Sequence, residues 1–468
     1  MKAKVTMVTF IDTPKKILMT VLGAAVLYTG VTMAGTAQAQ QKGPAIIRDT
    51  EIESIINEWG APVLKAANMT PDSINIVLVQ SPQLNAFVAG GANIFFYTGL
   101  IERTENPGEL VGVFAHELGH ISGGHLISAS NAIERASYES ILGMVLGIGA
   151  AIATGNGAAA QAVMAGSAKY SQAKFLAHSR VHESAADQAA LTYLDKAEMN
   201  PAGLASFLEK LSSEELLPRS QQSEYVRTHP LTHRRIEAAE ARALESPYAD
   251  KQWPQKWNEQ HARMKAKLIG FIDPGRVPWV YSDQDNSVAA RYAHAIAHYR
   301  QNNVQKALDR INALISDEPD NPYFHELKGQ MLVDFGRVGE AEPAYKRAVD
   351  LLPNAPLIRI AYAHTLLENR KSDTAKLKTA IENLERALAD EKRSTRANRL
   401  LATAYGRLGR EDIAKVYLAE EAILQRRYDY AKRQADSALQ TLKAGSREAL
   451  KARDIIAYAD AHTGAANN

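Results

Sequence analysis

Apolar residues recur at helical spacing over most of this chain, and short runs with strand-like alternation interrupt them near its start. The pattern predicts a helix over residues 46–68. It then predicts three strands, rich in alternating or β-branched apolar residues, over residues 73–79, 85–89 and 93–98. Because the later apolar patterns have the helical period, we expect a predominantly α-helical protein whose N-terminal part is an α+β domain with a small sheet.

The next predicted helix runs from Asn106 to a pair of glycines. Asn106 is a good N-cap, Pro107 suits the first turn, and Glu109 supplies an acid three positions after the cap. Gly123 and Gly124 provide a stop at the other end. The residues between these signals therefore share one helical register.

This helix contains the run His116-Glu117-Leu118-Gly119-His120. Four residues advance a helix by about 400° and about 6 Å, so His116 and His120 share one face and can bind one divalent ion. Glu117 projects to the side, where its carboxylate can act as general base on a water at that ion. Two imidazoles, a carboxylate and an open position suit zinc, with manganese and cobalt as alternatives. The run predicts a metallopeptidase, and the alternative is an ordinary helix with incidental histidines.

A second predicted helix, which includes residues 179–187, offers a third ligand. Glu183 is the candidate. Asp187 lies one helical turn later, where it can accept the outer N–H of a ligand histidine and fix the orientation of the ring. Several alanines around Asp187 permit close packing of this helix. The alternative for both carboxylates is a role as exposed helix charges.

An internal period of 34 residues begins near residue 288. This is the period of tetratricopeptide repeats, which are pairs of helices stacked into a solenoid with a concave surface for peptides or protein segments. A role as a spacer without a ligand is the alternative. Ala295, Ala307 and Pro319 recur as Gly329, Ala341 and Pro353. A third and a fourth unit are marked by Ala363, Ala380, Ala387, Ala402, Gly409 and Ala414, and residues 430–457 form further or capping helices.

In combination, these motifs resemble the gluzincin metallopeptidases related to the CAAX prenyl protease, in the branch that carries tetratricopeptide repeats. The resemblance rests on the His116–His120 run, the downstream Glu183 and Asp187, and the upstream stretch 85–94, and it covers nearly the whole chain after the first segment. It implies zinc held by His116, His120 and Glu183, with Glu117 as the base. It also implies a periplasmic enzyme, misassembled outer-membrane beta-barrel proteins as substrates, and barrel-assembly machinery as a partner.

Two further histidines need assignment. His125 follows the glycine pair that ends the first helix, so we expect it to pack or to form a hydrogen bond. His229 stands in Arg227-Thr228-His229-Pro230-Leu231, which matches the later His-Pro motif of the family and implies that it lies near the zinc. Three roles stay open for His229. It can stabilise the oxyanion of the reaction, bind the metal as a fourth ligand that keeps the enzyme inactive, or cap the turn before Pro230.

The first segment has the pattern of a secretory signal. Lysines precede an apolar run over residues 17–34, and Ala37-Gln38-Ala39 matches a small-x-small cleavage pattern. The alternative is an uncleaved anchor, because the run approaches the roughly 20 residues that span a bilayer. The expected organisation is a cleaved signal peptide in residues 1–39, a zinc metallopeptidase domain in 40–253, a junction in 254–284 and the repeats in 285–468.

Composition restricts the choice of function. The whole chain has a net charge of +2, and residues 1–39 hold four lysines and one aspartate, so a mature chain is close to neutral and offers no basic surface for nucleic acid. The absence of cysteine excludes disulfides and thiolate ligands, which suits an oxidising periplasm.

Residues 140–168 carry no charge and are rich in Gly and Ala. We expect a helical hairpin or a cover over the active site there, with peripheral membrane contact as the alternative.

The sequence therefore predicts an exported zinc endopeptidase. An extended polypeptide is expected to pair with a strand at the edge of the sheet beside the metal, while the repeats recruit substrate or assembly machinery. Two alternatives differ in class or in compartment. One is a repeat-based chaperone or scaffold for outer-membrane protein assembly with a latent protease domain, and the other is a cytosolic peptidase.

Overall fold

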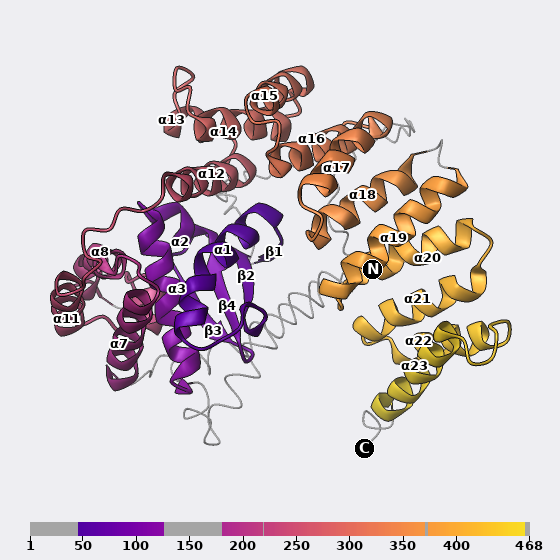
Figure 1. Cartoon of the computed structure of the whole chain (residues 1–468), viewed down its shortest axis with the longest axis horizontal. Helices are drawn as coiled ribbons and strands as arrows, with labels where there is room; N and C mark the ends of the chain where they lie inside the picture. Colours follow the sequence, from indigo (N-terminus) through magenta and orange to yellow (C-terminus); the bar gives the residue numbers. More distant parts are fainter. Residues whose placement is uncertain (1–44, 126–179, 219, 370–372, 464–468) are drawn as a thin grey trace, which may run out of the picture.

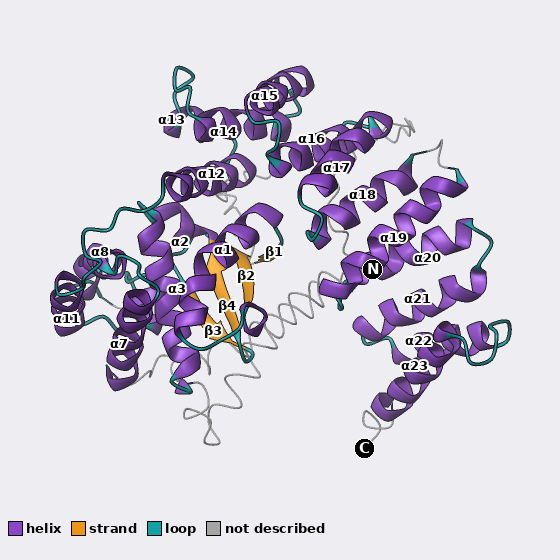
Figure 2. Cartoon of the chain, viewed as in Figure 1, coloured by secondary structure: helices purple, strands orange, loops and turns teal. Residues whose placement is uncertain are grey.

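The computed structural model describes residues 45–125, 180–218, 220–369 and 373–463 (Figure 1). The predicted signal segment and the uncharged stretch 140–168 lie outside these residues. Among the helices that the structure describes, none is both long and apolar enough to cross a membrane. Figure 2 shows a small sheet surrounded by helices in the N-terminal part and helices alone in the rest of the chain. The predicted predominantly α fold, with a small sheet followed by helical repeats, is confirmed.

The sheet has four strands in the order β1-β2-β4-β3. β2 and β4 are parallel, whereas β1 pairs with β2, and β3 with β4, in antiparallel fashion. β3 and β1 are therefore the two edges of the sheet. The strands are β1 (Ala45–Ile47), β2 (Asn75–Gln80), β3 (Ala86–Ala89) and β4 (Asn93–Tyr97).

The helix predicted from residue 46 begins later, and this part of the prediction was wrong. Residues 45–47 form β1 instead, because they pair with β2. Helix α1 (Thr50–Ala66) begins after Asp49, whose side chain accepts a hydrogen bond from the amide of Ile52. A local N-cap and a long-range strand pair together set this boundary, and the strand pair leaves no trace in helical periodicity.

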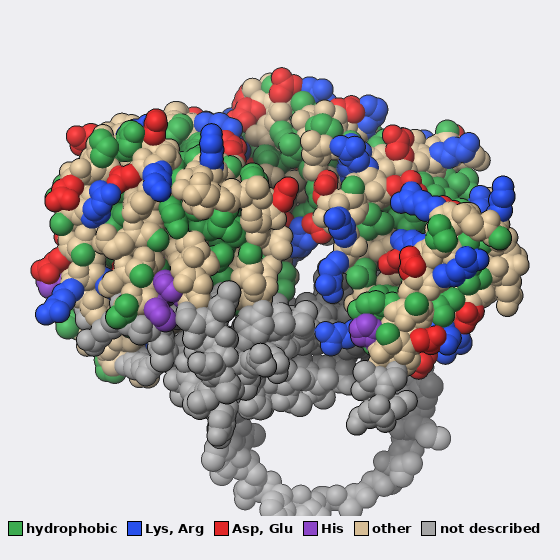
Figure 3. Space-filling model, turned by 60° about the horizontal axis from the view of Figure 1, so that its bottom comes forward, with side chains coloured by type: hydrophobic (Ala, Val, Ile, Leu, Met, Phe, Trp, Pro, Cys, Tyr) green, Lys and Arg blue, Asp and Glu red, His purple; other side chains and the backbone are tan. Residues whose placement is uncertain are grey.

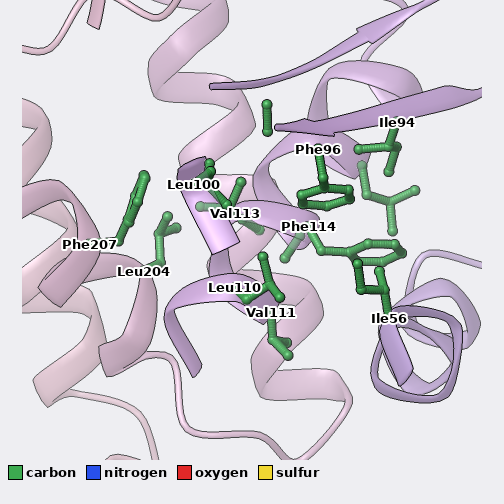
Figure 4. Packing of buried hydrophobic residues seen from close by; sticks show 14 of the residues in the cluster. Ile56, Ile94, Phe96, Leu100, Leu110, Val111, Val113, Phe114, Leu204 and Phe207 are labelled. Atoms are coloured by element: carbon green, nitrogen blue, oxygen red, sulfur yellow. The ribbon is translucent and has the colours of Figure 1, made fainter. Parts of the chain in front are cut away.

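Helix α3 (Pro107–Ser122) lies at the centre of the N-terminal part. Every residue from Pro107 to His120 is buried. Figure 4 shows Phe114 of this helix between Phe96 of β4 and Ile56 of α1. On another side, a Cβ atom at Gly119 would lie only 2.7 Å from the carbonyl oxygen of Ala186. The two histidines of the motif thus lie in the hydrophobic core, on a helix in close contact with its neighbours.

Further helices pack around α3. Of these, α7 and α8 contact it directly, and α11 packs on both α7 and α8. The remaining helices of the N-terminal part are α2 (Thr98–Arg103), α7 (Arg180–Lys196), α8 (Ala202–Lys210), α9 (Ser212–Glu215), α10 (Glu224–Thr228) and α11 (His233–Leu244).

The segment expected to be a junction is mostly helical. Helix α12 (Gln255–Ile272) packs on α2 of the N-terminal part and on the first repeat helix, and the short α13 (Val277–Val280) follows. Trp257 on α12 stacks on Trp59 of α1 with ring centroids 5.2 Å apart, and on Trp253 at 5.5 Å. These aromatic contacts attach the junction to the N-terminal part.

The repeats form a curved array of helix pairs beside the N-terminal part (Figure 1). Small residues let the paired helices approach, and at Gly329 an added Cβ atom would lie 2.6 Å from the ring of Tyr345. The pairs are α14 (Val288–Arg300) with α15 (Val304–Asp317), α16 (Pro322–Asp334) with α17 (Val338–Leu351), α18 (Pro356–Glu368) with α19 (Thr374–Asp390), α20 (Thr395–Arg407) with α21 (Glu411–Leu424), and α22 (Tyr428–Leu439) with α23 (Arg447–Thr463).

The start of α1 contacts the repeats through buried charged groups. Glu51 is fully buried, accepts a hydrogen bond from the Tyr292 hydroxyl of α14 at 3.1 Å, and lies 3.3 Å from the Lys267 ammonium group of α12. The Thr50 hydroxyl donates to Glu326 of α16 at 3.0 Å. The first repeats are thus docked on the N-terminal part by groups that need their partners, because an unpaired buried charge is strongly unfavourable.

This interface predicts a dependence of stability on pH. Partial burial raises the pKa of Glu326 to about 7; Lys267 opposes this shift, and the charge of Asp49 adds to it. A carboxyl group whose pKa is higher in the docked state binds its proton more tightly there, so docking weakens as pH rises from about 4.5 to 7. We expect Glu326→Gln, which imitates the protonated acid, to raise the melting temperature at pH 8 by about 2 °C and to change it little at pH 5.

Scanning calorimetry at the two pH values measures this effect. Glu382→Gln, which changes an exposed carboxylate of the same repeats, is the control and should leave both melting temperatures as they are. Equal shifts at pH 5 and pH 8 for the Glu326 variant would show that its carboxyl group is not the titrating group.

Candidate metal centre

Three segments bring four potential ligands to one point. His116 and His120 come from α3, Glu183 from α7, and His229 follows the end of α10. All four side chains are buried, and one ligand atom from each lies within 4.8 Å of the others. The sequence predicted the first three as ligands and His229 as a candidate fourth, and the structure brings all four together.

The distances between the ligand atoms indicate a site for a cation. The Nε2 atoms of His116 and His120 are 3.1 Å apart. The two carboxylate oxygens of Glu183 lie 3.5 Å from these nitrogens, one from each. Within the described part of the chain, one of these oxygens, Oε1, is buried without a hydrogen-bond donor. Nitrogen and oxygen lone pairs that face each other at such distances fit a divalent ion that accepts imidazole and carboxylate ligands.

Both ligand histidines have a polar side chain close to the outer nitrogen of the ring. Asp187 Oδ1 lies 2.9 Å from Nδ1 of His116, which is the contact expected from the helical spacing of Asp187. Nδ1 of His120 lies 3.1 Å from Nδ1 of His125, so His125 has a hydrogen-bonding role. A proton held on the outer nitrogen leaves the inner lone pair of each ring free for a metal.

The charges around His116 favour a cation at this point. Burial by itself lowers the pKa of His116, but Asp187 and Glu183 outweigh it and raise that pKa to about 10. Burial likewise opposes ionisation of Glu183, yet His229 and His116 hold its pKa well below the usual value. The carboxylates therefore create a negative potential where the ring nitrogens meet, which suits a positive ion.

Glu117 lies beside this group and is fully buried. Among the described residues, neither of its carboxylate oxygens has a hydrogen-bond donor, and Oε1 is 3.5 Å from Nε2 of His229. Burial raises the pKa of Glu117, and His229 and His116 offset part of this effect. A carboxylate with a raised pKa is a better general base near neutral pH than one with the ordinary value.

The edge of the sheet closest to the ligands is β3. Its residue Ala86 has a carbonyl oxygen 3.2 Å from Nε2 of His229, and β3 also contacts α3. The strand edge that the sequence placed beside the metal is therefore β3. All four residues of this strand are buried.

Two residues of the centre escaped the sequence analysis. Arg235 of α11 is buried, and its Nε and Nη2 donate to the Asp187 carboxylate at 2.7 and 2.9 Å. Tyr225 stacks on His229 with ring centroids 4.6 Å apart. A signal for Arg235 was present, since it adjoins the apolar face of α11 next to Ile236, where a charge implies a buried partner.

A helix-borne histidine pair, a glutamate from a second helix and a buried acid beside them define a metallopeptidase centre. Residues 47–243 match the model of peptidase family M48, and residues 292–356 match a tetratricopeptide repeat model. The N-terminal part of the chain thus matches peptidase family M48, and the protein is a metallopeptidase with tetratricopeptide repeats.

Curated relatives share both parts. The chain is 25% identical over 419 residues to the Beta-barrel assembly-enhancing protease of Escherichia coli (strain K12), a match that covers 87% of this chain and 83% of the relative. It is 23% identical over 341 residues to the protein of the same name from Yersinia pestis, with 70% and 68% of the two chains covered. The similarity therefore extends across the peptidase domain and into the repeats.

Proposed function

We propose that this protein is a zinc endopeptidase that cleaves misfolded or misassembled proteins, with outer-membrane beta-barrel proteins as its substrates. The observation that carries the proposal is the group of four buried ligand atoms within 4.8 Å of one another, beside which the Glu117 carboxylate has no hydrogen-bond donor in the described part of the chain. Imidazole and carboxylate ligands without a thiolate suit a catalytic zinc ion. The names of the relatives support the substrate class.

His116, His120 and Glu183 would hold the metal, which when bound supplies a Lewis acid for the scissile carbonyl and makes a water more acidic. Glu117 takes a proton from the attacking water and passes it to the leaving amine. Asp187 keeps His116 in the tautomer that presents Nε2. The β3 edge aligns an extended polypeptide through its backbone, so that many sequences are accepted.

His229 fits a resting state in which it is a fourth ligand. Its Nε2 lies 3.2 Å from the Ala86 carbonyl oxygen, to which it can donate. Its Nδ1 lies 3.3 Å from Glu183 and 3.4 Å from Nε2 of His116, within the ligand group, where a deprotonated Nδ1 would bind the metal. This position of Nδ1 supports the inhibitory role, because a fourth protein ligand would occupy the open position that a catalytic metal needs.

We therefore expect His229→Ala to increase the cleavage rate of an unfolded protein. If the open state makes up about one tenth of the wild-type population, the increase is about tenfold. His233→Ala, which removes an exposed histidine of α11, is the control and should leave the rate unchanged. A large loss of activity in the His229 variant would instead assign it to oxyanion stabilisation.

The periplasm is the proposed location. The signal-like residues 1–39, the lack of cysteine and the relatives named for barrel assembly support it. N-terminal sequencing of the protein from the periplasmic fraction tests this, because a cleaved signal leaves a new N-terminus after Ala39. A chain that starts at Met1 in the cytosolic fraction would refute it.

The repeats are proposed to recruit substrate or the barrel-assembly machinery. In Figure 3, lysine and arginine side chains lie on the repeats along the side toward the peptidase domain.

A chaperone or scaffold with a latent protease domain is the competing function, and the variant Glu117→Gln distinguishes it from the peptidase. If barrel assembly is impaired in the variant that no longer cleaves, the result supports the peptidase. If the variant assists barrel assembly as well as the wild-type protein does, the result supports the chaperone.

A further inference from the structure

The Arg235 guanidinium contacts three parts of the centre at once. Besides its two hydrogen bonds to Asp187, its Nη1 lies 3.1 Å from Oε2 of Glu183 and donates to the carbonyl oxygen of Pro230 at 2.9 Å. Pro230 directly follows His229 in the chain. One buried side chain therefore joins the helix that carries Glu183 and Asp187 to the segment that carries His229.

The charges of the surrounding carboxylates explain why a cationic side chain is needed at position 235. Glu117, Glu183 and Asp187 are three carboxylates buried around one point. A divalent ion and one guanidinium group together balance three negative charges, whereas the ion alone does not. Arg235 supplies this balance without taking a ligand position, because its nitrogens approach Glu183 and Asp187 from the side of α11.

The shape of the guanidinium group matters as much as its charge. Its planar fork binds both oxygens of Asp187, and the remaining nitrogen is still free to bridge Glu183 and Pro230. Lysine carries the same charge as a compact ammonium group on a flexible chain and cannot form this set of contacts.

We propose that Arg235 is a positioning residue that holds Glu183, Asp187 and the His229 segment as one unit, so that the ligand geometry and the placement of His229 are set together. This inference rests on the proposed function, since it assumes that Glu183 binds the metal. It adds that the His229 segment is released from the ligands when the contacts of Arg235 are lost.

The test compares Arg235→Lys with Arg234→Lys, a matched change at the exposed neighbouring position of α11. Each purified full-length protein is loaded with cobalt(II), whose visible spectrum reports the arrangement of its ligands. The transfer of the metal to a chelator is then timed. We expect an altered spectrum and metal loss about 10 to 100 times faster for Arg235→Lys, and wild-type behaviour for Arg234→Lys.

A second measurement follows the His229 segment in the metal-free proteins. Hydrogen exchange of the amides in residues 224–232 should be about tenfold faster in Arg235→Lys than in wild type, and unchanged in Arg234→Lys. An unaltered cobalt spectrum, or unaltered exchange in this segment, would overturn the inference. Failure of the wild-type protein to bind any metal is a distinct result, which would refute the proposed function itself.

A double-mutant comparison tests whether Arg235 acts through Asp187. Asp187→Asn, Arg235→Lys and the combined variant are compared by the same chelator assay. Since both residues belong to one contact network, the double variant should lose metal no faster than about the worse single variant. Fully additive effects would show that Arg235 and Asp187 act separately, against the proposal.

Discussion

Replacement of Glu117 by glutamine is expected to lower kcat/KM for an unfolded protein substrate by about 10³-fold. Glutamine has nearly the same size but cannot accept a proton from the attacking water. Glu117 projects beside the ligand group, and both of its oxygens are buried without donors among the described residues, so the substitution removes no structural hydrogen bond that the structure shows. The metal content of the variant should therefore equal that of the wild-type protein.

Cleavage assays combined with elemental analysis check this expectation. Glu209→Gln, at an exposed position of α8, is the matched control and should retain full activity. Turnover at the wild-type rate by a metal-loaded Glu117 variant would refute the assignment of this residue as the general base.

Glu183→Gln is expected to have the second large effect, through loss of the metal. The amide keeps one oxygen but removes the negative charge that faces His116 and His120, and it leaves Arg235 without part of its counter-charge. Mutation of a residue that only hydrogen-bonds to a metal ligand already weakens metal affinity by about 10 to 100-fold. The loss of the charge of a ligand itself should therefore weaken metal binding by at least about 100-fold. Activity should fall in proportion and recover in part with excess zinc.

Titration with a competing chelator measures the affinity, and cleavage at increasing zinc concentrations measures the recovery. Glu240→Gln on the exposed face of α11 is the control. Unchanged zinc affinity in the Glu183 variant would exclude Glu183 as a ligand. The Glu117 and Glu183 variants also discriminate between two causes of inactivity, since the first should keep the metal and the second should lose it.

Local patterns in the sequence were sufficient to predict several features of the structure. The side chain of Asn106, the predicted N-cap, accepts a hydrogen bond from the amide of Glu109. The helix ends at Ser122, immediately before the predicted stop. Because four residues return a helix nearly to the same face, the placement of His116 and His120 followed from spacing alone. The repeats were equally readable, since their period is a property of neighbouring helix pairs.

The sequence by itself therefore determined the helix that carries His116 and His120, the repeat array and the residue types that can bind a metal, because each depends on contacts within a few turns or one repeat. Tertiary structure alone decided where β1 pairs, which strand edge faces the ligands, which way His229 points and what Arg235 holds. These depend on contacts between segments far apart in the chain, such as His229 with Ala86 and Arg235 with Asp187. Spacing along one helix carries no information about such pairs, since they form only when separate elements pack together.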